Sequence, residues 1–389
     1  MKYLKSILGI LAVVFLVYIF TFYVDGEMGM ILIAFVLFAP LVSLFLTLYA
    51  RNRVKVTFNC DAYVKKGSKL IVTVIVEKKG SFPCSVLEVC PYASVIFGQG
   101  IKNRKLTMLN EKKKTFKIEL DAMIGGNGEI GICAVYSSGF MGFFKLPLKT
   151  PLPNPVSVGV IPELPDIKAS TQLFRAIADV VYTSDEEEEN DTAMMFSANT
   201  SPGYEHREYE LGDPLKRINW KLSSKKSKLM VRLDEAAASV QPVLVLDLYR
   251  KNTVLAENAV RAEEQLIRSV FGLLTLLVKQ GIACSFAYRT SSGETILESV
   301  DNPDYPNQLL LKVLAVKVIP DKRVDLSQIG SSMCACVIAT TDAGGDFSAV
   351  TDCIENSENV SLIGLSAASA NSTSLPLWYL DEDNNFKLV

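Results

Sequence analysis

PVLVLDL, residues 242–248, is a continuous apolar run that carries one carboxylate, Asp247. Runs of this kind are typical of strands that are buried on both faces of a parallel sheet. Strands and helices then alternate to the C-terminus, which predicts an α/β domain over residues 240–389 whose mainly parallel sheet is covered on both faces. Any site is expected at the carboxyl ends of the strands. The further elements expected here are a helix near 256–279, strands near 283–288, 336–341 and 360–365, and helices near 304–315 and 347–356.

Residues 207–221, upstream of this strand, form a stretch dense in charges and turn residues. Gly212 can take a positive φ, Asp213 can accept hydrogen bonds from the first free N–H groups of a helix, and Pro214 fits the first helical turn. A helix is therefore predicted to start here, with Arg217 one turn beyond Asp213 and in reach of a local ion pair. The stretch is either a structural staple that joins this helix to a core or a docking surface. We expect Trp220 to be buried.

The same stretch resembles the signature of the domain-of-unknown-function 58 family, whose members carry an arginine, an aromatic residue, a Gly-Asp pair, a basic residue and a tryptophan at this spacing. Many members have Asp where this chain has Asn before the tryptophan. The matching residues are Arg207, Tyr209, Gly212, Asp213, Arg217, Asn219 and Trp220. The resemblance spans nearly the whole chain and implies two N-terminal membrane segments, a β-rich domain and a C-terminal domain similar to von Willebrand factor type A modules (Rossmann-like). It also implies partnership with a MoxR-type AAA ATPase in protein assembly or chaperone-like envelope processes.

Type A modules often bind a divalent cation through an Asp-x-Ser-x-Ser loop after the first strand and an Asp after the fourth, and such oxygen ligands suit magnesium. The corresponding loop here keeps Asp247, but it lacks both serines and has Arg250 and Lys251, two cations that would repel a metal. Asp342 matches the distal acidic position. The sequence therefore predicts a degenerate site at Asp247 and Asp342 that holds no metal, and no cofactor. Both carboxylates are expected to be strand-end caps or partner contacts.

An enzyme is the alternative of a different class. The one histidine, His206, lies close to Glu208 and Asp213, so these residues form the candidate acid–base group of a hydrolase. The sequence contains no Gly-x-Ser-x-Gly elbow, Cys-His signature or phosphate loop. We therefore predict that the chain is not an enzyme. A metal-dependent adhesion module outside the cell is a further alternative, which the lost serines oppose.

The middle of the chain changes in pattern. Residues 54–160 largely alternate apolar and polar side chains in short runs separated by turns, which predicts an antiparallel β-sandwich. Residues 161–239 are predicted to be a linker that carries the signature. The acidic run 185–191 has no periodicity and is expected to be a flexible loop. The strands expected in the sandwich lie near 54–58, 70–76, 85–89 and 114–120.

The N-terminal residues 1–53 are predicted to form a transmembrane helical hairpin. Ile7–Tyr23 and Met30–Tyr49 are apolar runs of roughly the 20 residues that cross a bilayer. Cations flank the hairpin on its outer sides and none lies in its turn, so both ends are expected in the cytoplasm. The flanking cations are Lys2, Lys5, Arg51, Arg53 and Lys55. The chain is thus predicted to be a multi-pass protein of the cell membrane with cytoplasmic globular domains.

The spacing of the cysteines and the net charge limit the classes of partner that the sequence supports. The 8 cysteines lie in strand-like segments without the paired spacing of a metal knuckle, which favours reduced thiols. A formal net charge of −2 gives no support for a nucleic-acid partner. The predicted partners are therefore the lipid bilayer, the MoxR-type ATPase and other proteins, and the predicted function is that of a membrane-anchored cytoplasmic scaffold or adaptor.

Overall fold

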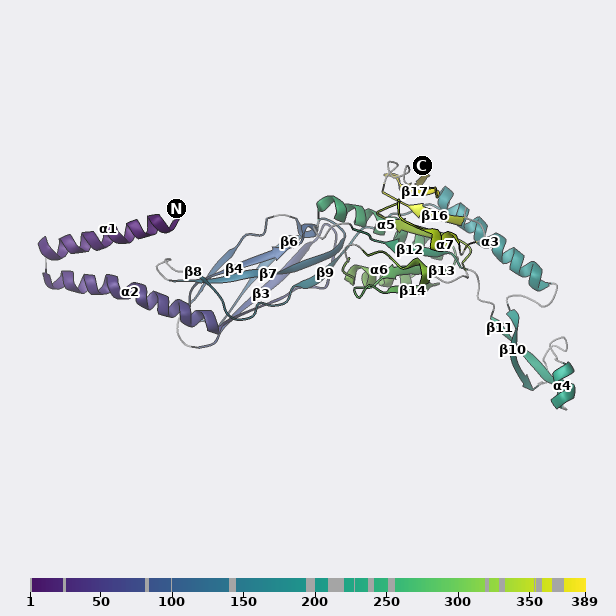
Figure 1. Ribbon diagram of the computed structural model, residues 1–389, viewed down its shortest axis with the longest axis horizontal. Coiled ribbons are helices and arrows are strands. Elements are labelled where there is room, and N and C mark those ends of the chain that lie inside the picture. The colour runs from purple at the N-terminus through teal and green to yellow at the C-terminus, as the bar shows by residue number, and fades with distance from the viewer. Residues whose placement is uncertain are drawn as a thin grey trace. The chain divides into compact units, whose positions relative to one another are not determined.

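The structure is a computed structural model that divides into two compact units, the first covering Met1–Pro162 and the second beginning at Glu163 (Figure 1). It describes the chain apart from residues 1, 24–25, 81–83, 99, 140–144, 194–199, 209–219, 227, 237–240, 251–255, 319–321, 329–332, 353, 355–358 and 366–373. For residues 2–8, 10–11, 85, 183–193, 200–208, 220 and 231–236 it describes the backbone without the side chains.

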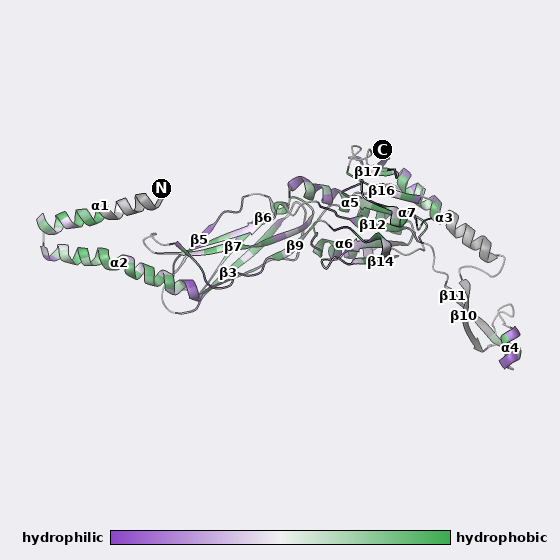
Figure 2. Ribbon diagram, in the orientation of Figure 1, coloured by the Kyte–Doolittle hydropathy of each residue, from purple (hydrophilic) through white to green (hydrophobic). Residues whose placement is uncertain are grey.

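Two helices open the first unit, α1 (Lys2–Tyr23) and α2 (Gly26–Arg53), and they lie against each other. Within the described residues, α2 with its 28 residues is the helix long and apolar enough to cross a membrane. The apolar stretch described in α1 is shorter, Ala12–Tyr23. Figure 2 shows the apolar colour along α2. Among the described residues one helix, α2, is therefore both long and apolar enough to span a membrane, and the second span remains a prediction.

The rest of the first unit is a β-sandwich-like domain of two sheets. The smaller sheet has the order β1 (Val54–Asn59), β3 (Lys69–Lys78), β6 (Lys113–Asp121). The larger has the order β2 (Tyr63–Lys65), β9 (Val156–Ile161), β7 (Gly126–Ser138), β4 (Cys84–Ala93), β5 (Arg104–Met108), with β8 (Lys145–Pro147) beside β7 and the short helix η1 (Val95–Phe97) after β4. Neighbouring strands are antiparallel except for the β2–β9 pair. The predicted sandwich is thus present in its coarse form.

Strand β3 shows why this part folds as a two-layered sheet. Its alternate residues Leu70, Val72, Val74 and Val76 are each at most 3% exposed, whereas Ile71 between them is 47% exposed. Successive side chains of a strand point to opposite faces, so this alternation buries one face of the sheet and leaves the other to solvent.

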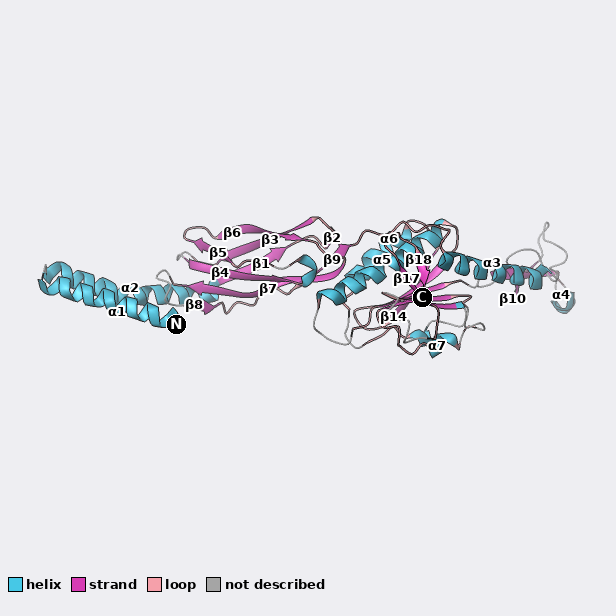
Figure 3. Cartoon of the chain, turned by 90° about the horizontal axis from the view of Figure 1, so that it is seen from above, coloured by secondary structure: helices cyan, strands magenta, loops and turns pink. Residues whose placement is uncertain are grey.

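The second unit is built on a mixed sheet whose parallel centre carries antiparallel edges. Its order is β14 (Thr295–Val300), β13 (Cys284–Arg289), β12 (Val243–Asp247), β15 (Cys336–Thr340), β16 (Val360–Ile363), β17 (Leu377–Leu380), β18 (Phe386–Leu388). The five neighbouring strands β13, β12, β15, β16 and β17 are parallel to one another. The edge strands β14 and β18 are antiparallel to their neighbours. The helical elements are α5 (Glu257–Lys279), α6 (Tyr305–Ala315), η3 (Leu326–Gln328) and α7 (Ser348–Thr351). Figure 3 shows helical elements on both sides of this sheet, with α5 on one side and α7 on the other. The sequence predicted the parallel strands up to β16 but none of β14, β17 and β18.

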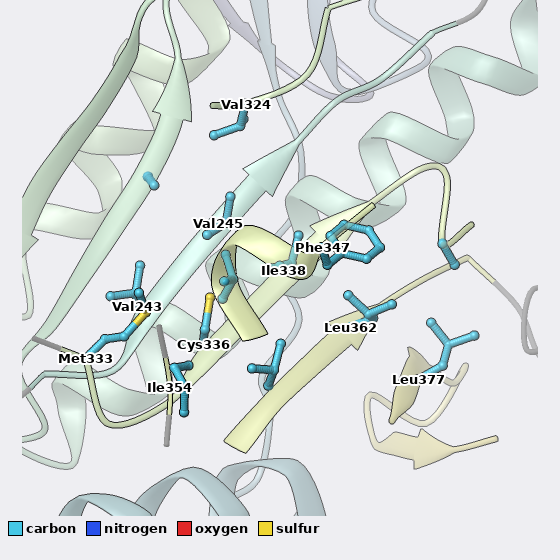
Figure 4. Packing of buried hydrophobic residues seen from close by; sticks show 14 residues of the cluster. Val243, Val245, Val324, Met333, Cys336, Ile338, Phe347, Ile354, Leu362 and Leu377 are labelled. Atoms are coloured by element: carbon cyan, nitrogen blue, oxygen red, sulfur yellow. The ribbon is translucent and has the colours of Figure 1, made fainter. Parts of the chain in front are cut away.

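The continuous apolar run of β12 is buried on both faces of this sheet. Val243 and Val245 belong to a cluster with Phe347 beside α7 (Figure 4). On the opposite face the Phe271 ring of α5 lies 5.0 Å, centroid to centroid, from the Phe286 ring of β13. All residues of β12 are buried, as expected for a central parallel strand.

The expected flexible loop at 185–191 is wrong, because this run lies within α3 (Gln172–Ala193). The first half of α3 supplies an anchor that the acidic run itself lacks. Leu173, Ile177 and Val181 follow helical spacing and are at most 9% exposed. Glutamate has a good helix propensity, so a helix that begins on this apolar stripe can continue through the acidic residues.

A small hairpin carries the described part of the signature segment. It consists of β10 (Thr200–Glu208) and β11 (Met230–Ala236), which pair antiparallel, and α4 (Trp220–Lys226) lies between them in sequence. Buried Ser223 of α4 accepts a hydrogen bond through Oγ from the N–H of Met230 at 2.8 Å. This contact ties α4 to the start of β11.

Candidate functional site at the carboxyl edge of the α/β sheet

The centre of the α/β sheet contains a topological switch point. The next strand along the chain, β13, lies on one side of β12, and the later strand β15 lies on its other side. In open α/β sheets, ligand sites form in the crevice at the carboxyl ends of such strands. Here Asp247 ends β12 and is in register with Thr340, which ends β15. The sheet order therefore brings Asp247, Thr340 and the nearby Asp342 to one edge.

Asp247 is a buried carboxylate with its hydrogen bonds made inside the chain. Its side chain is 5% exposed. Oδ1 accepts a hydrogen bond from the N–H of Val324 at 3.1 Å, and Oδ2 accepts one from the Thr340 hydroxyl at 3.2 Å. Burial raises the pKa of Asp247 above its usual value, and these hydrogen bonds and nearby arginine charge oppose that rise.

Arg323 brings a positive charge to both acidic residues of the predicted site. Its Nη1 lies 3.9 Å from Oδ2 of Asp247, and its Nη2 lies 2.5 Å from Oδ2 of Asp342. The guanidinium also stacks over the Tyr249 ring, 4.4 Å from the centroid. A Cβ placed on Gly345 would lie 1.8 Å from Nη1, so the absence of a side chain there makes room for the arginine. The chain thus supplies its own cation where the sequence pattern suggested a metal.

The sequence predicted that a different arginine, Arg250, would repel a metal ion from this site. Arg250 forms an ion pair with Glu263 of α5, and both side chains are largely buried. Arg250 is therefore neutralised by the helix, while Lys251 lies outside the described residues. The cation that contacts the carboxylates is Arg323, which sequence reasoning missed because nothing in the local pattern links it to Asp247.

The donor set does not fit magnesium. Magnesium requires near-octahedral oxygen coordination, whereas this edge offers two carboxylates and one hydroxyl that are already bonded to protein donors. In the part of the chain that the structure describes, no group of three or more His, Cys, Asp or Glu residues could hold a metal ion. The predicted absence of a metal stays a prediction, and Arg323 gives it a physical reason.

A small cavity lies beside Asp247. Its volume is about 30 Å³, and its lining includes Tyr288, Arg289, Val313 and Lys317. This is room for a water molecule rather than for an organic substrate, which needs a pocket of several hundred Å³. A larger hollow of about 630 Å³ lies on the β-sandwich-like domain, between residues 97–104 and 117–121, and no histidine or cysteine lines it.

The signature residues lie on other elements. Arg207 is in β10, in register with Val231, and Trp220 is the first residue of α4. His206 and Glu208, proposed for the hydrolase alternative, are in β10 opposite Arg232 and Met230. The remaining signature residues lie outside the described residues, namely Tyr209, Gly212, Asp213, Arg217 and Asn219.

No protein-family model matches the chain, and no curated protein matches it. Several solved structures match parts of it. The CARDB domain of a Pyrococcus furiosus protein is 15% identical over 28% of this chain and 94% of that domain, with a TM-score of 0.23. A cohesin module from a Clostridium perfringens glycoside hydrolase is 14% identical over 29% of this chain and 99% of the module, with a TM-score of 0.23. Alpha-2-macroglobulin from Escherichia coli is 19% identical over 30% of this chain and 18% of that chain, with a TM-score of 0.24. Likenesses with such low TM-scores indicate neither the fold nor the function of this chain.

Proposed function

We propose that this chain is a membrane-anchored scaffold or adaptor that binds other proteins and catalyses no reaction. The observation that carries the proposal is Arg323, whose guanidinium lies between Asp247 and Asp342 at the switch point of the sheet. A metal site or an acid–base site built on Asp247 and Asp342 would need these carboxylates free to engage a ligand. These two are engaged by the protein itself, which suits a structural and binding role.

We also infer that residues 240–389 form a degenerate von Willebrand factor type A-like module. Numbered along the chain, the strand order corresponds to the 3-2-1-4-5-6 order of Rossmann-like sheets, with β14 antiparallel at the edge. Asp247 is the last residue of the first strand of the module and Asp342 comes shortly after β15, which supports the correspondence. In this interpretation an arginine side chain takes the position of the cation.

The membrane part of the proposal has α1 and α2 as a hairpin with both ends in the cytoplasm. The flanking cations and the length of α2 support it. A reporter fused after Val389 is expected to be active only in the cytoplasm, and one inserted at Asp25 only outside. A reporter after Val389 that is active outside the cell would overturn this orientation.

The partner proposed for the signature is a MoxR-type AAA ATPase. The test is crosslinking in membranes with nucleotide present, followed by purification of the full chain and identification of bound proteins. We expect the ATPase to co-purify with the wild type and to be lost with Arg217→Ala at an unchanged melting temperature. An Arg217→Ala protein that keeps the wild-type melting temperature and still binds the ATPase normally would show that the signature is not part of the interface. Hydrolytic turnover that His206→Ala abolishes would instead favour the enzyme alternative.

A further inference from the structure

The last turns of α2 are part of the β-sandwich-like domain. Ser43, Thr47 and Ala50 share one helical face and are at most 3% exposed. Gly139, which directly follows β7, packs so closely that a Cβ there would lie 2.4 Å from Oγ of Ser43. A helix face that is buried in this way fixes α2 to the domain.

The same turns present apolar side chains on their other faces. Val42, Phe45 and Leu48 are 54%, 59% and 44% exposed. Strand β1 begins at Val54, directly after α2 ends at Arg53, so no linker separates them. If α2 crosses the bilayer, as the proposed function requires, this end of the β-sandwich-like domain lies at the membrane surface.

Five basic residues surround this end of the domain, and we call them the helix-proximal cationic group. Its members are Arg51, Arg53, Lys79, Lys112 and Lys149. Backbone hydrogen bonds hold them together: Lys79 N–H donates to Arg53 O at 2.9 Å, and Lys149 N–H donates to Arg51 O at 3.0 Å. Lys112 lies in the turn whose carbonyl accepts from Lys78 N–H at 2.8 Å. Leu109, 55% exposed, lies in the same turn.

Three acidic residues of the neighbouring strands and of the turn before β6 are already paired with other lysines. Glu77 pairs with Lys113 at 3.2 Å, Glu111 with Lys114 at 3.5 Å, and Glu88 with Lys145 at 2.8 Å. Within the described residues, no carboxylate pairs with any member of the helix-proximal cationic group. Arg51 Nε donates to the carbonyl of Pro147, and Arg53 stacks on Tyr49, so neither contact neutralises their charge. This end of the domain therefore keeps an excess of positive charge.

We propose that the helix-proximal cationic group binds anionic phospholipid head groups and holds the β-sandwich-like domain against the bilayer. Lysine and arginine near a membrane surface are attracted to anionic lipids, and an aromatic residue such as Tyr49 at the end of a span is typical of the interface. The exposed Leu109 adds an apolar contact beside the cations. The inference rests on the membrane anchoring of the proposed function and adds its lipid preference.

The test uses the full chain in nanodiscs of phosphatidylcholine alone and of phosphatidylcholine with phosphatidylglycerol. We expect the melting temperature to be several degrees higher in the anionic discs at low salt, and the difference to vanish at high salt because ions screen exposed charges. A Lys79→Glu, Lys112→Glu, Lys149→Glu triple variant is expected to lose the difference. The matched control reverses charges elsewhere on the domain and is expected to keep it, using Lys65→Glu, Lys102→Glu and Lys117→Glu.

Native mass spectrometry of retained lipids gives a second measurement that does not depend on the stability of the variants. The wild type and the control are expected to retain phosphatidylglycerol over phosphatidylcholine, and the triple variant to lose this preference. Equal melting temperatures and no lipid preference in the wild type would overturn the proposal, as would a triple variant that behaves like the control. Release of the chain from native membranes by alkaline carbonate would contradict the anchoring itself, whereas a retained chain without lipid preference contradicts only the head-group binding.

Discussion

Arg323 and the helix-proximal cationic group place positive charge in two different settings. Arg323 is 29% exposed and meets two carboxylates of its own chain. Lys79, Lys112 and Lys149 are exposed and meet none within the described residues. Charge that is matched inside the fold stabilises the fold, whereas charge left facing solvent is available to a partner. Basic residues therefore have different roles in the two settings, and their substitution should affect stability in the first and partner binding in the second.

The largest effect is expected for Arg323→Ala. Removing the guanidinium takes away the charge that faces Asp247 and Asp342, which costs about 3 kcal/mol of unfolding free energy, the low end for a broken buried pair because Arg323 is partly exposed and the hydrogen bonds to Asp247 and the charge of Arg289 remain. Urea unfolding of the purified full chain measures it. The matched control is Arg175→Ala, an exposed arginine of α3, for which the change should stay within about 0.5 kcal/mol. Equal effects of the two substitutions would show that Arg323 is not a structural cation.

Gly345→Ala should have the next largest effect. The new methyl group would lie 1.8 Å from Nη1, so the guanidinium must move away from the carboxylates. We expect a loss of about 1–2 kcal/mol, as for other overpacked sites. In an Arg323→Ala background the same substitution should cost almost nothing, because the group with which it collides is absent. Additive losses of stability in this double-mutant cycle would mean that glycine is needed at position 345 for its backbone conformation and not to make room for Arg323.

The pH dependence of stability tests the burial of Asp247. Its folded-state pKa is raised above the usual 3.8, so the folded state binds this proton more readily than the unfolded state. The stability that Asp247 contributes therefore falls as pH rises from 3.8 through the folded pKa. The unfolding free energy of the wild type relative to Asp247→Asn should increase as pH is lowered from about 7 to about 4. The opposite slope would mean that Arg323 outweighs burial.

The smallest stability effect is expected at the cationic surface. Lys112→Ala in detergent should change the unfolding free energy by no more than about 0.5 kcal/mol, because an exposed side chain without a carboxylate partner contributes little to folding. Thermal and urea unfolding of the full chain measure it. A loss comparable to that of Arg323→Ala would remove the contrast between the two settings.

The elements that the sequence predicted are those with a strong local pattern. Strand β12 is apolar throughout, which predicts burial on both faces. Strand β3 is dense in the β-branched residues that favour strands, but which of its faces is buried does not follow from composition, because apolar Ile71 and Ile75 lie between the buried positions. Strands β17 (Leu377–Leu380) and β18 (Phe386–Leu388) are short and lie at or near the sheet edge, where pairing depends on neighbours that are distant in sequence. Helix α3 (Gln172–Ala193) was missed altogether, because residues 161–239 were predicted to be a linker and the acidic run within the helix has no apolar periodicity of its own.

The candidate site was predicted in part. Asp247 ends one strand and Asp342 comes shortly after another, so their meeting at one edge of the sheet follows from the parallel order. The arginine that joins them could not be predicted, because its loop is brought to Asp247 only by the fold: Val324 donates to a carboxylate 77 residues away along the chain. The pair Gly344-Gly345 after Asp342 was the one local sign that the backbone there makes room for a neighbour.

The most direct test of the account is the melting temperature of the full chain in magnesium chloride and in sodium chloride of equal ionic strength. Because Arg323 already supplies the cation for Asp247 and Asp342, we predict the same melting temperature in both salts. A metal that bound the native state would raise it by mass action. A saturable rise in magnesium that Asp247→Ala removes would contradict the account and make this edge a working metal site.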